Sequence, residues 1–469
     1  MLTPDLCVVG GGSGGLAVAA GAAQLGAAVV LIERGEMGGD CLNFGCIPSK
    51  SLIASSRLAA AWRRGPALGI ECQPPRVDLG AIADSVAGVV AAIAPNDSVE
   101  RFERLGVTVL RGEARFTGPR TLSVNGSEIR PRRFVIATGS SPAIPPIPGL
   151  AQLPYLTNET IFSNRELPAH LIVVGGGPIG IEMAQAYHRL GARVTVLDLG
   201  PLLPRDDPEM VRRLSEQLSG EGIELRPHVA ITAAARENGG LTIRLADGEG
   251  IIGSHILVAT GRQPTVEALN LSAAGIAANP HGVIVDARLR TTNRKAFALG
   301  DVAGGPQFTH VALYQAGVVI RNALFRLPAK VDYRALPWVT YTDPELAQVG
   351  LTEAAARQQF EDGIRVVSWP FAENDRAHTE RDTIGLTKIV TRQNGRILGA
   401  SILGAGAGDL IMPWGLAISQ QLKIGALANL IVPYPTRGEA GKRAAAAFYT
   451  PALFSPRTRR IVRFLAQLG

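Results

Sequence analysis

The feature that most constrains the fold of this chain is an apolar run leading into G-x-G-x-x-G, and it occurs twice. The runs are residues 6–9 and 171–174. The motif glycines are Gly10, Gly12 and Gly15 in the first copy, and Gly175, Gly177 and Gly180 in the second. Each copy continues into a helix-like pattern and a second apolar strand, and an acid (Glu33 or Asp198) lies roughly twenty residues beyond the glycines. Two complete copies predict two Rossmann-type nucleotide-binding domains.

The residue types in this pattern match what a dinucleotide requires. Glycines permit a tight turn and close approach of the backbone to a pyrophosphate, which then lies at the positive end of a helix. The acid at the end of the second strand accepts hydrogen bonds from a ribose diol.

Other segments support an internal duplication. Residues 134–139 and 256–261 are both apolar strands that end in Ala-Thr-Gly, and the proline-rich residues 142–148 after the first are expected to be a linker. A third strand, residues 296–301, ends in Gly-Asp, where a carboxylate can meet a sugar hydroxyl. From about residue 336 the pattern changes to alternating strands and helices, which predicts a separate α+β domain.

A pair of cysteines five positions apart, Cys41 and Cys46, indicates redox chemistry. Pro48 fits the first position of a helix, so Cys46 is expected at the positive end of the helix dipole, which favours thiolate over thiol. The alternatives are a structural disulfide or half of a zinc site. Zinc needs two more ligands, and no other Cys or His pair has ligand spacing, so no metal site is predicted. Cys7 is expected to be buried and inert, and Cys72 lies in a proline-rich loop.

Composition limits the remaining classes. A chain of 469 residues requires several domains, and four cysteines do not form a disulfide scaffold, so we expect a cytoplasmic protein. The first strand begins too early for a signal peptide, and no run reaches the ~18 uninterrupted apolar residues of a membrane span. Residues around Ile411 come closest. The net charge is +7, with a dense basic run at residues 457–463. Such a run can contact RNA or an anionic membrane, but we interpret it as a solvated helix face and predict neither a nucleic-acid partner nor stable membrane insertion.

Taken together, these motifs resemble the pyridine nucleotide–disulfide oxidoreductases, such as glutathione reductase, dihydrolipoamide dehydrogenase and mercuric reductase. The resemblance extends over essentially the whole chain, and Cys-x4-Cys followed by Pro-Ser-Lys is its most specific part. It implies an α/β fold with two Rossmann-type domains and a C-terminal α+β domain that forms a homodimer. The expected boundaries are 1–150 and 265–335 for an FAD-binding domain, 151–264 for an NAD(P)-binding domain and 336–469 for the dimerisation domain.

The resemblance also implies roles for single residues. The FAD ligands would be Gly10, Gly12, Gly15, Glu33, Ala114, Thr138, Gly139, Asp301 and His310. The nicotinamide cofactor would bind Gly175, Gly177, Gly180, Asp198 and Gly261. Lys50, paired with Glu182, would lie near flavin N5, Cys41 would exchange with substrate, and Cys46 would face the flavin. Hydride would pass from the nicotinamide to the flavin and electrons would pass on to the Cys41–Cys46 disulfide, or the reverse.

The preferred nicotinamide cofactor can be argued from one side chain. The carboxylate of Asp198 favours a free 2′-hydroxyl and repels a 2′-phosphate, so we expect NAD(H) in preference to NADP(H). Arg205, a few residues further on, is the feature that leaves NADP(H) open.

Three departures from the family pattern bear on the substrate. Tyr434 replaces the His that serves dihydrolipoamide dehydrogenases as acid–base, although Glu439 is kept, and a phenol with a pKa near ~10 is a poor proton acceptor. A Tyr here resembles mercuric reductases, yet no cysteine follows Cys72, so the vicinal pair that receives Hg(II) in those enzymes is missing. Asp40 replaces a Thr before Cys41 and is expected to raise the pKa of Cys41, and Pro178 replaces an aromatic residue.

The leading hypothesis is therefore a mercuric-reductase-like FAD enzyme that reduces a metal ion or a small disulfide. A divergent dihydrolipoamide dehydrogenase is the nearest alternative. A redox sensor that signals to a protein partner through its basic tail is an alternative of another class.

Overall fold

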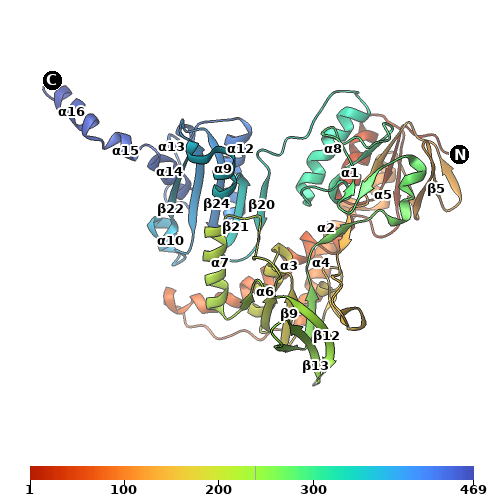
Figure 1. The fold of residues 1–469 in the computed structure, drawn as a ribbon, viewed down its shortest axis with the longest axis horizontal. Helices are drawn as coiled ribbons and strands as arrows, with labels where there is room; N and C mark the ends of the chain where they lie inside the picture. The colour runs from red at the N-terminus through yellow and green to blue at the C-terminus, as the bar shows by residue number, and fades with distance from the viewer. Residues whose placement is uncertain (238, 469) are drawn as a thin grey trace. The chain divides into compact units, whose positions relative to one another are not determined.

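The computed structural model describes residues 1–237 and 239–468, which form two compact units. Unit 1 contains residues 1–56, 76–199 and 229–331, and unit 2 contains residues 57–75, 200–228 and 332–468 (Figure 1).

The first sheet of unit 1 has five parallel strands in the order β19-β7-β1-β2-β3. Their bounds are Ala296–Ala298, Arg133–Ile136, Leu6–Val9, Val29–Glu33 and Val107–Arg111. All four residues of β1 are buried, and Val8 lies opposite Leu31 on one side and Val135 on the other. Unbroken apolar runs are typical of parallel strands that are covered on both faces.

Helices α1 (Ser13–Gln24) and α8 (Thr309–Ala323) pack closely against each other (Figure 1). The contact depends on small residues, since a Cβ on Gly14 would lie 3.2 Å from the Cβ of Ala312 and 2.3 Å from Leu299 Cδ1. The other helices that begin in this part of unit 1 are α2 (Gly39–Asn43), α3 (Cys46–Ala60), α4 (Leu79–Ile93) and α5 (Val99–Arg104).

A second set of parallel strands in unit 1 repeats this arrangement, in the order β10-β9-β15. The strands are Arg193–Leu197, His170–Val174 and His255–Val258, and α6 (Pro178–Leu190) follows β9. The smaller antiparallel sheets of unit 1 consist of β4 (Ala114–Gly118), β5 (Thr121–Val124) and β6 (Ser127–Ile129); β12 (Ile231–Glu237), β13 (Gly240–Leu245) and β14 (Gly250–Gly253); β8 (Ser140–Pro142) with β16 (Arg262–Pro264); and β17 (Ala278–Asn279) with β18 (Gly282–Val283).

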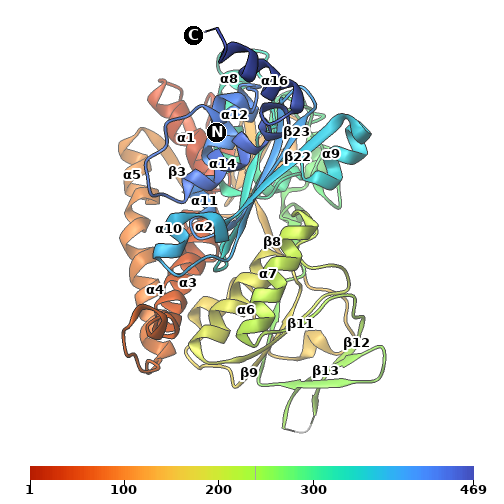
Figure 2. The ribbon, with the colours of Figure 1, turned by 90° about the vertical axis from the view of Figure 1, so that its left-hand side faces the viewer.

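Unit 2 is built on an antiparallel sheet in the order β20-β21-β24-β23-β22. Figure 2 labels β22 and β23 of this sheet. The strands are Pro337–Thr340, Glu345–Gly350, Ile397–Gly404, Leu386–Arg392 and Ile364–Pro370. Helices α12 and α14 pack on the sheet through Trp414, Ala440 and Ala444. The helices of unit 2 are α7 (Pro208–Glu221), α9 (Glu353–Phe360), α10 (Asp375–Thr379), α11 (Ala407–Leu410), α12 (Met412–Ser419), α13 (Gly425–Ala428), α14 (Gly438–Ala447), α15 (Thr450–Leu453) and α16 (Pro456–Leu465).

One helical run among the described residues, Leu79–Arg104, is long and apolar enough to cross a membrane by length and composition alone. Asp84 lies within this run and forms an ion pair with Arg165, and a 3-10 turn at Ala94–Asp97 separates α4 from α5. Core helices of soluble proteins pass the same test. The residues around Ile411 are divided between two short helices, α11 and α12.

Candidate active site

The first glycine motif forms a tight junction between a strand and a helix. Gly10 has φ +109°, and a Cβ there would lie 2.3 Å from the carbonyl oxygen of Ala137, in the first Ala-Thr-Gly segment. A Cβ on Gly15 would lie 1.9 Å from the carbonyl oxygen of Gly10. Gly12 is the N-cap of α1 and has open space, since a Cβ there meets only Gly39 at 3.8 Å. No side chain caps α1, so its N-terminal N–H groups are available to a phosphate.

The second motif has the same geometry. A Cβ on Gly175 would lie 2.3 Å from Ala259 O, and one on Gly180 would lie 1.9 Å from Gly175 O. Gly177, the N-cap of α6, has nothing within 4 Å, and again no side chain caps the helix. Both motifs therefore fit a dinucleotide pyrophosphate.

The two acids lie where the sequence pattern predicts them. Glu33 ends β2, and its Oε2 accepts a hydrogen bond from Gly11 N at 2.5 Å. Asp198 directly follows β10, and its Oδ2 accepts from Gly176 N at 2.6 Å. Each carboxylate is held beside its glycine loop, where a ribose diol would lie.

The redox pair lies on two consecutive helices of unit 1, with Cys41 in α2 and Cys46 as the first residue of α3. Both are free thiols, and Cys46 Sγ lies 3.6 Å from the hydroxyl of Thr309 at the start of α8. Pro48 was expected at the first helical position but is the third residue of α3. It is tolerated there because the first turn of a helix leaves its N–H groups without intrahelical partners.

The pKa values of the two thiols are shifted in opposite directions. The pKa of Cys46 is lowered to about 6, mainly by a hydrogen bond from Cys41 and further by Thr309 and by the charge of Lys50, against the effect of burial. The pKa of Cys41 is raised, because its thiol donates to Cys46 and is partly desolvated. The reduced pair is therefore a Cys46 thiolate held by a Cys41 thiol.

Lys50 and Glu182 connect the redox helix with the second Rossmann motif. Lys50 Nζ lies 2.8 Å from Glu182 Oε2, so α3 and α6 are joined by an ion pair. Glu182 is buried, whereas the Lys50 side chain remains about one third exposed.

Asp40 is paired, which corrects the expectation about its effect on Cys41. Arg262 Nη2 lies 3.0 Å from Asp40 Oδ1, and Asn158 donates a hydrogen bond to the same oxygen at 3.0 Å. The pKa of Cys41 is raised as expected, but by Cys46 and burial rather than by the Asp40 charge.

Arg262 also lies 3.7 Å from Asp301, which accepts a hydrogen bond from Ser140 at 2.5 Å. Burial raises the pKa of Asp301. The arginine therefore joins the acid before the dithiol to the acid of the Gly-Asp strand. The sequence analysis missed Arg262, although its place directly after the second Ala-Thr-Gly was a usable signal.

The remaining residues expected at the FAD and nicotinamide sites lie at strand ends of unit 1, except His310, which lies in the first turn of α8. Thr138 donates a hydrogen bond to Thr265 O at 2.6 Å, and a Cβ on Gly139 would meet nothing within 4 Å. Gly261 is likewise open, Ala114 is buried at the start of β4, and the His310 ring stacks on Phe308 at 5.1 Å. No contact among those described joins Ala114 to the dithiol.

Tyr434 and Glu439 lie in unit 2, before and within the first turn of α14. The Tyr434 side chain is exposed, and its hydroxyl donates a hydrogen bond to Asp375 Oδ2 at 2.9 Å. This bond and the negative charge of Asp375 raise the pKa of Tyr434. The phenol is thus a hydrogen-bond donor at neutral pH, and an even smaller fraction of it is ionised and able to accept a proton than in an isolated tyrosine.

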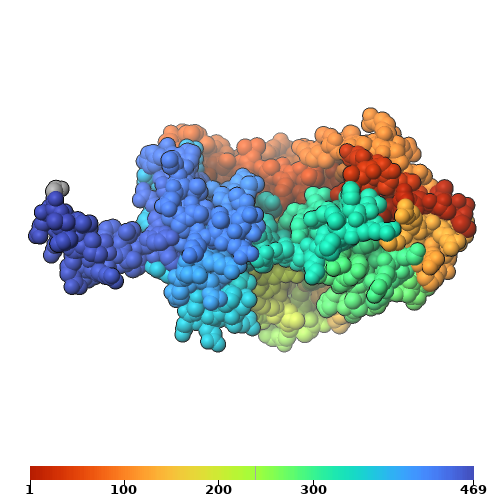
Figure 3. Space-filling view, turned by 90° about the horizontal axis from the view of Figure 1, so that it is seen from above, coloured from red at the N-terminus to blue at the C-terminus, as the bar shows by residue number. Residues whose placement is uncertain are grey.

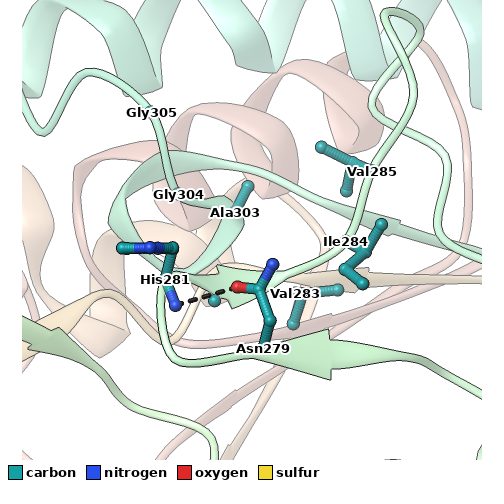
Figure 4. Close-up of a pocket in the computed structure, with 9 residues that line it drawn as sticks. Asn279, His281, Val283, Ile284, Val285, Ala303, Gly304 and Gly305 are labelled. Carbon is teal, nitrogen blue, oxygen red and sulfur yellow. Dashed lines mark hydrogen bonds between the residues drawn. The ribbon is translucent and has the colours of Figure 1, made fainter.

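A separate pocket of unit 1 is lined by residues 279, 281–285 and 303–305 (Figure 4). Asn279 accepts a hydrogen bond from His281 N there at 2.8 Å, and no predicted site residue lines the pocket. In the part of the chain that the structure describes, no three His, Cys, Asp or Glu side chains are grouped as a metal site.

Two open dinucleotide-binding motifs, together with a Cys41–Cys46 pair in which Cys46 begins a helix, define a flavoprotein disulfide oxidoreductase. The comparisons agree. The family model "Pyridine nucleotide-disulphide oxidoreductase" matches residues 4–316, and the dimerisation domain of that family matches residues 336–445. The chain therefore belongs to this family, is an oxidoreductase, and uses FAD and NAD(P)H. The dimerisation domain supports a homodimer.

Individual relatives differ in substrate. The chain is 36% identical over 451 residues to a mercuric reductase of Staphylococcus aureus, covering 95% of this chain and 82% of the relative. It is also 36% identical over 470 residues to a dihydrolipoyl dehydrogenase of Thermus scotoductus, covering 97% and 99%. Among solved structures it resembles the Cu(II) complex of the HOCl-induced flavoprotein disulfide reductase RclA from Escherichia coli, with TM-score 0.86, 28% identity, and 95% and 100% coverage.

Proposed function

We propose that this enzyme uses NADH to reduce a soft metal ion or a small disulfide through FAD and the Cys41–Cys46 pair. The observation that carries the proposal is the position of Cys46 as the first residue of α3, with its Sγ 3.6 Å from the Thr309 hydroxyl and its pKa lowered by Cys41. We also propose the domain boundaries stated above (1–150 and 265–335, 151–264, 336–469) and a cytoplasmic location, where thiols stay reduced.

Each residue has a distinct task in this scheme. When bound, FAD supplies the acceptor for hydride from the nicotinamide and the donor of two electrons to a disulfide. The Cys41–Cys46 disulfide takes up two electrons and one proton and opens to the Cys41 thiol and the Cys46 thiolate. Cys41 then attacks or binds the acceptor as its proton moves to the Cys46 thiolate along their hydrogen bond, and the pair closes again as two electrons and that proton leave. A disulfide acceptor becomes two thiols with one further proton from solvent, whereas the same two electrons reduce one Hg(II) ion to the metal atom or two Cu(II) ions to Cu(I).

The acceptor is inferred from Tyr434 and from the relatives. A protonated phenol does not take a proton from dihydrolipoamide, so a metal ion or a preformed disulfide, which requires no such base, is the better substrate. One relative is a mercuric reductase, and the RclA structure is a Cu(II) complex. NADH is preferred because Asp198 would repel a 2′-phosphate.

An anaerobic titration tests the proposal. NADH is added to the purified yellow holoenzyme while the visible spectrum is recorded, and NADPH is used in parallel. A long-wavelength absorbance band near half reduction, absent in Cys46→Ser, is expected, followed by turnover with Hg(II) or Cu(II). Simple bleaching of the flavin in both proteins would show that the cysteines do not exchange electrons with it. A stronger response to NADPH than to NADH would overturn the assignment of NADH and leave the rest of the proposal intact.

A further inference from the structure

Helix α16 of unit 2 is amphipathic, although neither of its faces is buried. Arg459 and Arg463 lie one turn apart, with Arg460 beside them. Ile461 and Leu465 form a second row on another side of the helix. No residue of α16 is buried, and Figure 3 shows the segment, in dark blue, fully accessible in that view.

The exposed apolar side chains of this segment are large. The exposed fractions are 66% for Phe454, 49% for Ile461, 59% for Val462, 61% for Phe464, 55% for Leu465 and 69% for Leu468. The basic run was interpreted from the sequence as a solvated helix face. That interpretation accounts for the arginines but not for a continuous apolar face beside them.

The charge of the segment has a single sign. Residues 440–468 contain six Lys and Arg residues and no Asp or Glu. Four of these, Arg457, Arg459, Arg460 and Arg463, belong to α16. If a second copy of α16 were the partner, eight arginines would lie together with no carboxylate to neutralise them. If RNA were the partner, its backbone would neutralise the arginines but leave the apolar face uncovered.

We propose that α16 binds the surface of an anionic lipid bilayer, lying parallel to it. Helices with arginine on one face and Phe and Leu on the other lie in the interface, with the apolar face at the acyl boundary and the cations at the headgroups. Arginine side chains extend their charged ends to the headgroups while their stems cover apolar surface. One partner thus complements both faces of α16. This is peripheral binding, independent of the electron-transfer proposal.

Vesicle co-sedimentation of the FAD-loaded full chain tests this. The vesicles are phosphatidylglycerol and phosphatidylcholine in a one-to-three ratio, or phosphatidylcholine alone. Each arginine near an anionic surface contributes about fivefold in affinity, so Arg459→Gln/Arg463→Gln is expected to bind roughly 25-fold more weakly. Phe464→Ser/Leu465→Ser should also lose binding. Neither pair should change FAD content or NADH turnover.

A matched control separates the surface from net charge. Arg120→Gln/Arg130→Gln removes the same charge from exposed arginines of unit 1 and should bind like wild type. Equal losses in both arginine pairs would reduce the effect to overall charge and overturn the proposal. Absence of binding to the mixed vesicles would also overturn the proposal. A shift in sedimentation from dimer to monomer in the α16 variants would overturn it as well, because it would assign the helix to the partner subunit. Binding to poly(U) in preference to vesicles would assign it to nucleic acid.

Discussion

Arg262 Nη2 lies 3.0 Å from Asp40 Oδ1, so the acid that precedes the redox cysteine is neutralised by a residue that follows the second Ala-Thr-Gly segment. The arginine side chain is 11% exposed and also lies 3.7 Å from Asp301. Its guanidinium therefore separates two carboxylates that would otherwise repel each other. The replacement of Thr by Asp before Cys41 is compensated within the same site.

Arg262→Met is expected to destabilise the holoenzyme by about 2 kcal/mol, between the values typical of exposed and buried ion pairs. Both acids lose the Arg262 cation and keep only their hydrogen bonds from Asn158 and Ser140. Asp40→Asn should cost less than about 1 kcal/mol, because an amide still accepts from Arg262. Combining the two should recover part of the loss. Denaturant unfolding at fixed FAD and protein concentrations measures the cycle, and strictly additive effects would show that the pair is not coupled.

The reduced enzyme should react with iodoacetamide in a pH-dependent way set by Cys46. Since its pKa is lowered to about 6, the thiolate forms as the pH rises through that value, and the rate should level off above about pH 7. Peptide mapping identifies the modified sulfur. Cys41→Ala removes the hydrogen bond that contributes most and should move the midpoint upward. A midpoint near 9 in the wild type would contradict the assignment of Cys46 as thiolate.

Tyr434→His should raise dihydrolipoamide oxidation at neutral pH by at least ~100-fold, the usual contribution of a general base, if the missing base is the only obstacle. Tyr434→Phe is the control and should bring no gain. Steady-state rates with dihydrolipoamide test this prediction. An unchanged rate in Tyr434→His would mean that the substrate channel itself differs from that of dihydrolipoamide dehydrogenases.

Lys388 in unit 2 is surrounded by carboxylates, with Nζ 3.1 Å from Asp207, 3.3 Å from Glu209 and 2.6 Å from Glu353. Burial opposes its charge, but the acids outweigh burial and raise the pKa of Lys388. Its stabilising charge is thus fully present below the ordinary lysine pKa and is lost only as the pH rises through the raised value. Lys388→Met should cost about 3–5 kcal/mol at pH 7, because Asp207 stays buried without a cation.

The exposed Lys423→Met provides the comparison for that substitution in the same unit. Its free energy of unfolding should stay within about 0.5 kcal/mol of wild type. Similar values for the two variants would show that the buried cluster contributes no net stability.

Local patterns predicted the parts of the site that depend on local rules. The strands before Gly10 and Gly175 follow from apolar runs and glycine spacing. Helix-end chemistry predicts the helix after Cys46, but it places the start at Pro48, two residues beyond the actual start. The pairing of Arg262 with Asp40 could not be predicted in this way, because it joins residues far apart in the chain through tertiary structure. The pairing of Tyr434 with Asp375 has the same origin. The apolar face of α16 was missed for another reason: the arginines were considered by number rather than by helical period.

The two Rossmann motifs have diverged wherever a side chain can vary, as Glu33 against Asp198 and Ser13 against Pro178 show. They have not diverged at Gly15 and Gly180, where an added methyl group in either copy would meet a carbonyl oxygen at the same 1.9 Å. A larger residue at either position would require the backbone to move apart first, so a single substitution there is not tolerated. The same close approach of backbone to backbone therefore requires glycine at both positions.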